Sequence, residues 1–175
     1  MKQIFLGRAT VLAAILATSA ATSAQSQCAS EAQTFLSCTL EKSGKTLSVC
    51  VMGNTATYRF GPKGAPELTL STPLDRLDYR PWNGVGSSIW EEVRFANNDV
   101  TYAVYGSILR MAADDGDGPN LSAGVEVLRG ETSLANLSCD QKSVVFPWNE
   151  TISDAKRAAG LTWDRPSQSW RAGGE

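Results

Sequence analysis

The sequence predicts an all-β fold, an eight-stranded antiparallel barrel or sandwich that is disulfide-bridged and carries a short C-terminal helix and a tail. Three observations lead to this prediction. Short β-rich runs recur along the chain and are separated by turn residues. The stretch 88–105 alternates apolar and polar residues on both sides of a tight turn. The chain also contains 4 cysteines, an even number that suits a disulfide framework.

Residues 1–24 have the pattern of a secretory signal peptide. Lys2 and Arg8 give a positive start, residues 11–17 are apolar, and small residues at 22–24 suit cleavage after Ala24. The apolar run is too short to span a bilayer, and no later run is long enough, so we expect no transmembrane segment. The sequence thus predicts a periplasmic or secreted protein whose mature chain begins with a polar arm, 25–33.

The β domain is expected at 34–148, and its first four strands at 34–40, 46–51, 55–60 and 67–71. Turn residues stand between these runs, among them Gly44, Gly53 and Gly61. The following segment, 72–87, has aromatic and charged residues but no clean period. We expect it to be a long loop, which is often functional or crosses between layers.

The stretch 88–105 is expected to form a hairpin around an Asn97-Asn98 turn, because Asn tolerates the positive φ angles of such turns. This register places Val93 opposite Tyr102 and Trp90 opposite Tyr105. Residues that share the expected core face are Ile89, Val93, Phe95, Val100, Tyr102 and Val104, together with Glu91. The other face carries Trp90, Glu92, Arg94, Thr101, Ala103 and Tyr105.

An acidic, glycine-containing loop follows at 111–120, and two more strands are expected at 124–128 and 132–139. Beyond Cys139 the character of the chain changes. Thr151 or Ser153 can cap a short helix that ends at Gly160, which gives a helical segment at 149–163. Residues 164–175 are expected to be a disordered tail.

The cysteines Cys28, Cys38, Cys50 and Cys139 are expected to form two disulfides in an oxidising compartment. If the first two strands pair around Gly44, Cys38 lies opposite Val49 and Cys50 points to the other face. A Cys38–Cys50 bridge would then need a bulge. Of the three possible pairings this leaves two, and we favour the one in which Cys38–Cys139 ties the first strand to the last and Cys28–Cys50 clamps the N-terminal arm.

Charge and composition exclude several classes of function. Loss of Lys2 and Arg8 changes the net charge from −2 to −4, which disfavours nucleic acid and anionic membranes as partners. The count of histidines is 0, so the usual general base and the commonest transition-metal ligand are absent. Bridged cysteines would also be unable to serve as nucleophiles or zinc ligands. We expect no cofactor, no metal site and no catalytic residue.

Two acidic features of the sequence could contradict this expectation. Glu91 lies on the predicted core face, where a buried carboxylic acid would be a functional candidate, but its place near a strand end favours access to water. Asp114, Asp115 and Asp117 with Asn120 offer oxygen ligands of the kind that calcium takes. Their spacing matches no EF-hand loop, so a solvated hairpin loop is the preferred interpretation.

Aromatic and basic residues supply the candidate binding site. Aromatic residues and arginine anchor many protein interfaces, and aromatic rings also stack on sugars. Such residues could gather on one outer face of the hairpin and the preceding loop: Tyr79, Arg80, Trp82, Trp90, Arg94 and Tyr105. The alternative is a second small core, in which the loop 72–87 or the segment 144–148 covers Trp90 and Tyr105.

Several short motifs resemble a family of uncharacterised exported bacterial β-rich proteins. The resemblance covers about 34–139 and rests on the order of its motifs, and it implies no activity. The motifs are Phe35-Leu-Ser-Cys38, Lys45-Thr-Leu-Ser-Val-Cys50, Tyr58-Arg-Phe-Gly-Pro62, Pro66-Glu-Leu68, Thr101-Tyr-Ala-Val-Tyr105, Ala123-Gly-Val-Glu-Val127 and Leu137-Ser-Cys139.

The chain is also similar in outline to the periplasmic or membrane-bound inhibitors of C-type lysozyme. Those are small exported eight-stranded β-barrels with one cysteine in an early strand and one near the end, places comparable to Cys38 and Cys139. Their Ser-Gly-x-x-Tyr motif is not matched by the nearest stretch here, Gly86-Ser-Ser-Ile-Trp90, so no residue role is carried over.

From these observations we expect a non-enzymatic exported binding or inhibitor module that acts through its aromatic face, most simply on a protein partner. A second class is an envelope structural or assembly protein that docks through the segment 144–175. A third is a carboxylate-dependent glycan hydrolase with Glu91 as its acid.

Overall fold

A computed structural model describes residues 27–30, 32–110 and 120–173. Within them the fold is mostly β, with antiparallel strands, one short α-helix and a 3₁₀ helix at Gln141–Ser143. Strands β1–β4 and β6–β9 correspond to the eight predicted runs. The strands are β1 (Gln33–Thr39), β2 (Thr46–Met52), β3 (Thr55–Gly61), β4 (Leu68–Pro73), β5 (Asp78–Arg80), β6 (Ser88–Asn97), β7 (Val100–Leu109), β8 (Leu121–Arg129), β9 (Thr132–Ser138), β10 (Leu161–Asp164) and β11 (Ser169–Ala172), and the helix is α1 (Thr151–Ala158).

The first sheet is a four-stranded meander in the order β1-β2-β3-β4. Its first two turns place Gly44 at φ 65° and Gly53 at φ 55°, a backbone region where other residues are strained. Within β1–β2, Cys38 lies opposite Leu47 and Leu36 opposite Val49, so the expected pairing of Cys38 with Val49 is wrong by two residues. A two-residue shift leaves every side chain on its predicted face.

The second sheet has five strands in the order β5-β6-β7-β8-β9. The β6–β7 turn lies at Asn98-Asp99, with Asn98 at φ 55°, one residue later than predicted. Val93 is therefore opposite Val104, and Trp90 is opposite Ser107 rather than Tyr105. The predicted core face is preserved, since this shift is also two residues.

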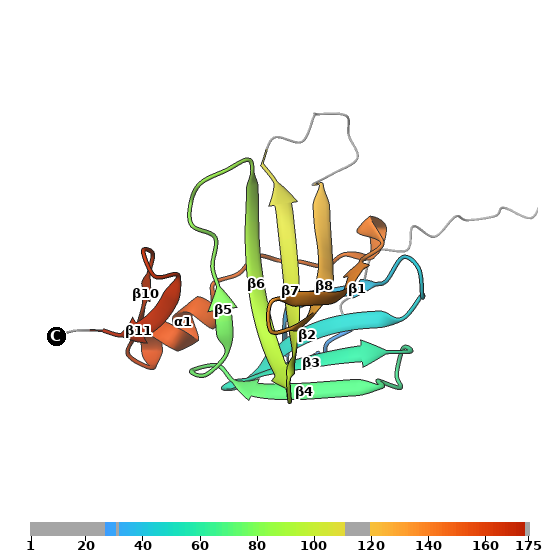
Figure 1. The fold of residues 1–175 in the computed structure, drawn as a ribbon, viewed down its shortest axis with the longest axis horizontal. Coiled ribbons are helices and arrows are strands. Elements are labelled where there is room, and N and C mark those ends of the chain that lie inside the picture. The colour runs from blue at the N-terminus through green and yellow to red at the C-terminus, as the bar shows by residue number, and fades with distance from the viewer. Residues whose placement is uncertain (1–26, 31, 111–119, 174–175) are drawn as a thin grey trace, which may run out of the picture.

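The two sheets cross one another in Figure 1 and share one apolar core. Core residues come from both, such as Leu47 and Val49 of β2 and Val93 and Phe95 of β6. The strands do not close into the single eight-stranded barrel that was one of the two predicted forms; they divide into sheets of four, five and two strands. The expected loop 72–87 contains β5, which adds a short edge strand beside β6.

Both disulfides have the pairing favoured from the sequence. Cys28–Cys50 joins the N-terminal arm to β2, and the two Cα atoms are 5.6 Å apart. Cys38–Cys139 joins β1 to the residue that follows β9, with a Cα separation of 5.8 Å. A β-bridge between Leu40 and Cys139 brings the ends of these strands together, which explains how residues 101 apart in sequence can be linked.

The chain after Cys139 crosses the core and then forms a separate unit, the C-terminal lobe, made of α1 and the β10–β11 hairpin. Val145 pairs with Ser37 of β1, and the Phe146 ring packs against Gly106 of β7. The expected disordered tail from Asp164 onward is wrong, because this segment holds the end of β10 and all of β11. In the described residues, no helix has the length and apolar character needed to cross a membrane.

Candidate functional site

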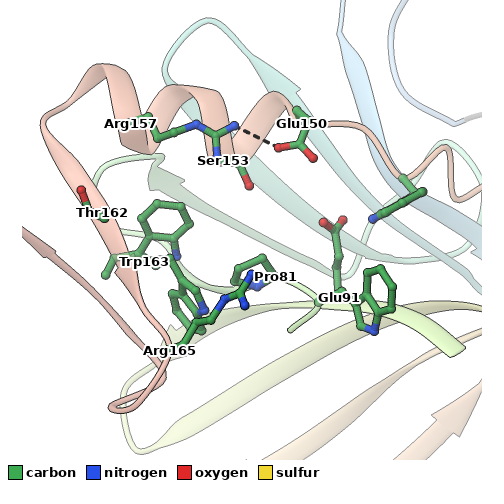
Figure 2. Close-up of a pocket in the computed structure, with 11 residues that line it drawn as sticks. Pro81, Glu91, Glu150, Ser153, Arg157, Thr162, Trp163 and Arg165 are labelled. Carbon is green, nitrogen blue, oxygen red and sulfur yellow. Dashed lines mark hydrogen bonds and ion pairs between the residues drawn. The ribbon is translucent and has the colours of Figure 1, made fainter. Parts of the chain in front are cut away.

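The C-terminal lobe and the β5–β6 side of the second sheet enclose a cleft of about 440 Å³ (Figure 2). We call it the tryptophan cleft, because four of its lining side chains are indoles. Its volume lies in the range of small-ligand sites, which is about 300–1,000 Å³. The lining residues are Pro81, Trp82, Glu91, Trp148, Glu150, Ser153, Arg157, Thr162, Trp163, Arg165 and Trp170.

The indoles form two pairs. Trp163 and Trp170 lie opposite one another across the β10–β11 hairpin, with ring centroids 5.6 Å apart. Trp82 follows β5 and meets Trp148, which precedes α1, edge to face at 6.2 Å. Trp148 is 39% exposed and so presents a large apolar surface to water. Together the pairs supply flat, rigid contact area on walls from different parts of the chain.

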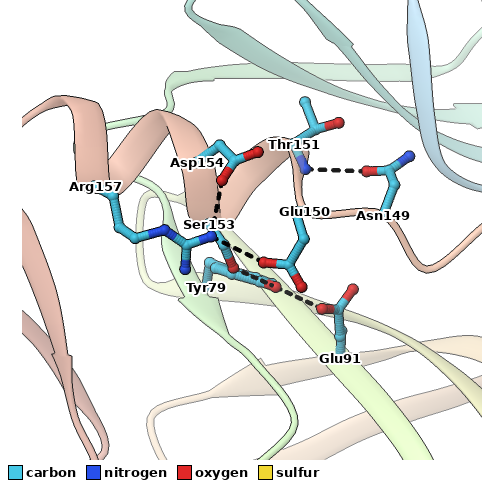
Figure 3. Close-up of polar contacts among 8 residues, drawn as sticks. All are labelled: Tyr79, Glu91, Asn149, Glu150, Thr151, Ser153, Asp154 and Arg157. Atoms are coloured by element: carbon cyan, nitrogen blue, oxygen red, sulfur yellow. Dashed lines mark hydrogen bonds and ion pairs between the residues drawn. The ribbon is translucent and has the colours of Figure 1, made fainter.

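Local sequence explains why α1 stands at this cleft. The Asn149 side chain accepts a hydrogen bond from the Thr151 backbone N–H at 3.2 Å (Figure 3), which replaces a bond that a helix start lacks. Ile152, Ser153 and Lys156 are buried, so one face of the helix packs on the sheets. Gly160 at φ 78° then turns the chain into β10.

Tyr79 of β5 joins the lobe to the sheet. Its ring stacks on Trp170 with centroids 6.0 Å apart, and its backbone carbonyl accepts a 2.8 Å hydrogen bond from the Trp170 indole N–H. Its hydroxyl donates to Glu91 Oε1 at 2.6 Å and lies 3.2 Å from Ser153 Oγ (Figure 3). One tyrosine therefore contacts β6, α1 and β11.

Glu91 is the buried acidic group of the cleft. Its residue is 4% exposed, and it lies opposite Gly106 on the face that the pattern predicted. Burial raises the pKa of Glu91 from 4.5 to about 7; the Tyr79 hydrogen bond opposes this shift, and the charge of Glu150 adds to it. Glu91 can therefore hold a proton near neutral pH, although water access was the interpretation favoured from the sequence.

Glu150 has a contrasting environment. Its side chain is 66% exposed, and its Oε2 lies 3.0 Å from Arg157, which also pairs with Asp154 at 2.8 Å. These exposed ion pairs contribute little to stability, on the order of 0–1 kcal/mol each. Their effect is to hold a carboxylate and a guanidinium at the edge of the cleft.

Lys156 lies behind this surface. It is 2% exposed, its ammonium is 5.5 Å from the centre of the Trp170 ring, and it donates to the Asp75 carbonyl at 3.4 Å. Burial lowers the pKa of Lys156, while the charges of Asp78 and Asp75 oppose that shift. Lys156 supports the Trp170 wall but does not line the cleft.

The six predicted binding residues are not gathered on one face. Trp82 lines the cleft, and Tyr79 lies beneath it. Arg80 and Arg94 both approach Glu92, at 3.9 and 2.7 Å, on the opposite face of the sheet.

The other two predicted residues, Trp90 and Tyr105, lie apart from the cleft. In the described part of the chain no ring contact joins Trp90 to Tyr105, whose hydroxyl instead crowds the space beside Gly124. The strand register places Arg80, Trp90, Arg94 and Tyr105 on that same opposite face, whereas Tyr79 and Trp82 lie at the cleft, so the predicted set is divided between the two faces of the sheet.

Sequence reasoning missed most of the cleft, namely Trp148, Glu150, Ser153, Arg157, Trp163, Arg165 and Trp170. One signal could have found the hairpin. Trp163-Asp164 and Ser169-Trp170 flank a Pro-Ser turn, and they place two tryptophans at opposite positions of short strands. Such a signal is weak, because strands of four residues offer little alternation to detect.

The described residues contain no cluster of carboxylate or cysteine side chains that could hold a metal. Asp114, Asp115 and Asp117, the possible calcium ligands of the acidic loop, lie outside the described residues. No protein-family model matches the chain, and neither a curated protein nor a solved structure matches it significantly.

Proposed function

We propose that this chain is an exported binding protein whose tryptophan cleft takes a segment of an uncharged sugar chain. The proposal rests on the four indoles of the cleft, which form the pairs Trp82–Trp148 and Trp163–Trp170. The same concave site also holds hydroxyl, carboxylate and guanidinium groups. Indole faces stack on the apolar faces of pyranose rings, and the polar groups can bind their hydroxyls.

Charge and shape favour this ligand over the alternatives. The lining carries two acidic residues, Glu91 and Glu150, and two basic ones, Arg157 and Arg165, so neither a polyanion nor a polycation is selected. A protein partner was the simplest expectation from the sequence, but protein interfaces are usually broad, whereas this site is a concave cleft of about 440 Å³.

Export is supported by two features together. The first 24 residues have a signal-peptide pattern, and both disulfides suit an oxidising compartment. The periplasm or the extracellular space is therefore the proposed location.

The test is calorimetric titration with cellohexaose and N-acetylchitohexaose. We expect Trp148→Ala to weaken binding at least about tenfold, roughly 1.4 kcal/mol, because an exposed stacking surface is removed. Trp90→Ala is the matched control: it deletes the same side chain outside the cleft and should leave affinity unchanged. Equal losses in both variants, with each fold checked by circular dichroism, would contradict the assignment to this cleft.

A further inference from the structure

Two carboxyl groups face the tryptophan cleft from opposite walls, in contrasting environments. Glu91 projects from β6, is almost fully buried and shares a short hydrogen bond with Tyr79. Glu150 precedes α1, is exposed and is ion-paired with Arg157. A pair of carboxyl groups with one apolar and one solvated environment is the arrangement in which one acts as an acid and the other as a base.

The carboxyl groups of Glu91 and Glu150 also face the same part of the cleft. Figure 3 shows the Glu91 and Glu150 side chains extending toward each other beside the Tyr79 hydroxyl. The charge of Glu150 makes the smallest of three contributions to the pKa of Glu91, which agrees with this placement. Both residues line the cleft, so a bound sugar chain would have one on each side.

We propose that the tryptophan cleft hydrolyses a glycosidic bond of the sugar chain it binds, with Glu91 as the proton donor and Glu150 as the carboxylate that activates water. This rests on the proposed sugar binding and goes beyond the non-enzymatic role expected from the sequence. Uncharged pyranose oligosaccharides are the substrate class.

The chemical step balances without any cofactor. The bond between the anomeric carbon and the glycosidic oxygen breaks, its electron pair stays on that oxygen, and the oxygen takes the proton from Glu91. A water oxygen forms a new bond to the anomeric carbon while Glu150 takes a proton from that water. One water is consumed, two hydroxyl ends are produced, and exchange with solvent returns the proton from Glu150 to Glu91.

Tyr79 is a positioning residue in this scheme. Its hydroxyl donates a hydrogen bond to Glu91 Oε1, so the transferable proton of Glu91 would be carried by the other carboxyl oxygen, Oε2. Ser153 lies 3.2 Å from the same hydroxyl and fixes it from the helix side. The cleft thus holds the acid in one orientation before a sugar arrives.

The experiment incubates the exported full-length mature protein with cellohexaose and N-acetylchitohexaose in ¹⁸O-labelled water. Mass spectrometry then detects shorter products that carry the label at the new reducing end. Glu91→Gln and Glu150→Gln should each lower the cleavage rate at least about 100-fold while leaving sugar affinity within a few-fold, since proton transfer contributes about 10²–10⁴-fold. Glu131→Gln, an exposed turn residue outside the cleft, is the matched control and should cleave like wild type.

The outcomes separate this inference from the proposed function. Binding of a probe by wild type without labelled product would overturn the hydrolysis and leave the binding proposal intact. No binding and no cleavage would overturn both. Undiminished cleavage by either variant would remove that residue from its role and so refute the mechanism. If Glu91→Gln fails to fold, as judged by circular dichroism, the exposed Glu150→Gln still decides the outcome.

Discussion

The two crossed sheets and the C-terminal lobe keep their positions by different means. The sheets share a continuous apolar core; one disulfide ties the N-terminal arm to β2, and the other ties β1 to the residue after β9. The lobe is a single short helix and a two-stranded hairpin. Ile152 of its helix reaches the shared core, and contacts through Tyr79, Ser153 and Trp170 join the rest of the lobe to the second sheet. Apolar burial is insensitive to direction and to pH, whereas hydrogen bonds and buried ionisable groups are sensitive to both.

Because of this difference, the sheets contribute mainly to the stability of the fold, whereas the lobe contributes mainly to the proposed site. The sheets supply a fixed wall, β5 and β6, on which Tyr79 and Glu91 are held in place. The lobe supplies the Trp163–Trp170 pair, and Glu150 stands immediately before its helix. Substitutions in the two regions should therefore differ in the size of their effect and in their dependence on pH.

The largest effect is expected from the disulfides of the sheet region. Cys38→Ala with Cys139→Ala opens a loop of 101 residues and should lower the free energy of unfolding by about 5 kcal/mol. Cys28→Ala with Cys50→Ala opens one of 22 residues and should cost about 3 kcal/mol. Urea unfolding of both double variants measures the two losses. A larger loss from the Cys28–Cys50 pair would show that chain entropy does not set the ranking.

A pH-dependent effect of intermediate size is expected at the junction of the two regions. Burial raises the folded-state pKa of Glu91 from 4.5 to about 7. The folded state then binds the proton more tightly than the unfolded state, so this contribution is fully present below about pH 4.5 and is lost as pH rises through about 7. The corresponding change in unfolding free energy is roughly 3 kcal/mol.

Unfolding measured from pH 4 to pH 8 tests this pH dependence. Glu91→Gln should remove that part of the pH dependence, because the amide does not titrate. Tyr79→Phe should move its upper limit to higher pH, because the Tyr79 hydrogen bond lowers the pKa of Glu91 and is lost in the variant. A Glu91→Gln protein with the wild-type pH profile would rule out Glu91 as the group responsible.

The smallest effect is expected within the lobe itself, from two chemically identical substitutions. Trp170→Phe removes the hydrogen bond from its indole to the Tyr79 carbonyl and should cost about 1 kcal/mol. Trp163→Phe removes a buried indole N–H that has no partner in the described structure, so its cost should be close to zero. Thermal unfolding of both variants, one beside the other, checks the difference. Equal costs would mean that ring packing, and not the hydrogen bond, holds the hairpin.

Most of the features that could be predicted depend on residues close together in the sequence, such as the faces of strands and the positions of turns. The β6–β7 faces were assigned correctly from the alternation of residues such as Val93 and Phe95, although the register was wrong by two positions. Asn97-Asn98 and Asn98-Asp99 are both acceptable turns, and a two-residue shift cannot be detected from a pattern of period two. The same alternation disfavoured a Cys38–Cys50 bridge, while the choice between the two remaining disulfide pairings rested on tying the first strand to the last.

The cleft could not be predicted in this way, because its walls come from residues as distant as Trp82, Glu91 and Trp163. The β10–β11 hairpin is ordered by contacts such as the one between Trp170 and Tyr79, which are 91 residues apart. Two strands of four residues have little stability of their own, so the order of this segment depends on tertiary contacts that no local window contains. Polar composition alone made it resemble a tail.

The position of Cys139 has a mechanical consequence. The Cys38–Cys139 bond closes a covalent ring around both sheets, and the whole C-terminal lobe follows that ring in the chain. Tension applied at the C-terminal end would therefore peel away β11, β10 and α1 in turn and reach a covalent stop at Cys139. Under tension the C-terminal lobe, and with it the tryptophan cleft, would therefore unfold before the sheets. Because the sheets would stay folded, the lobe could refold on them when the tension is released.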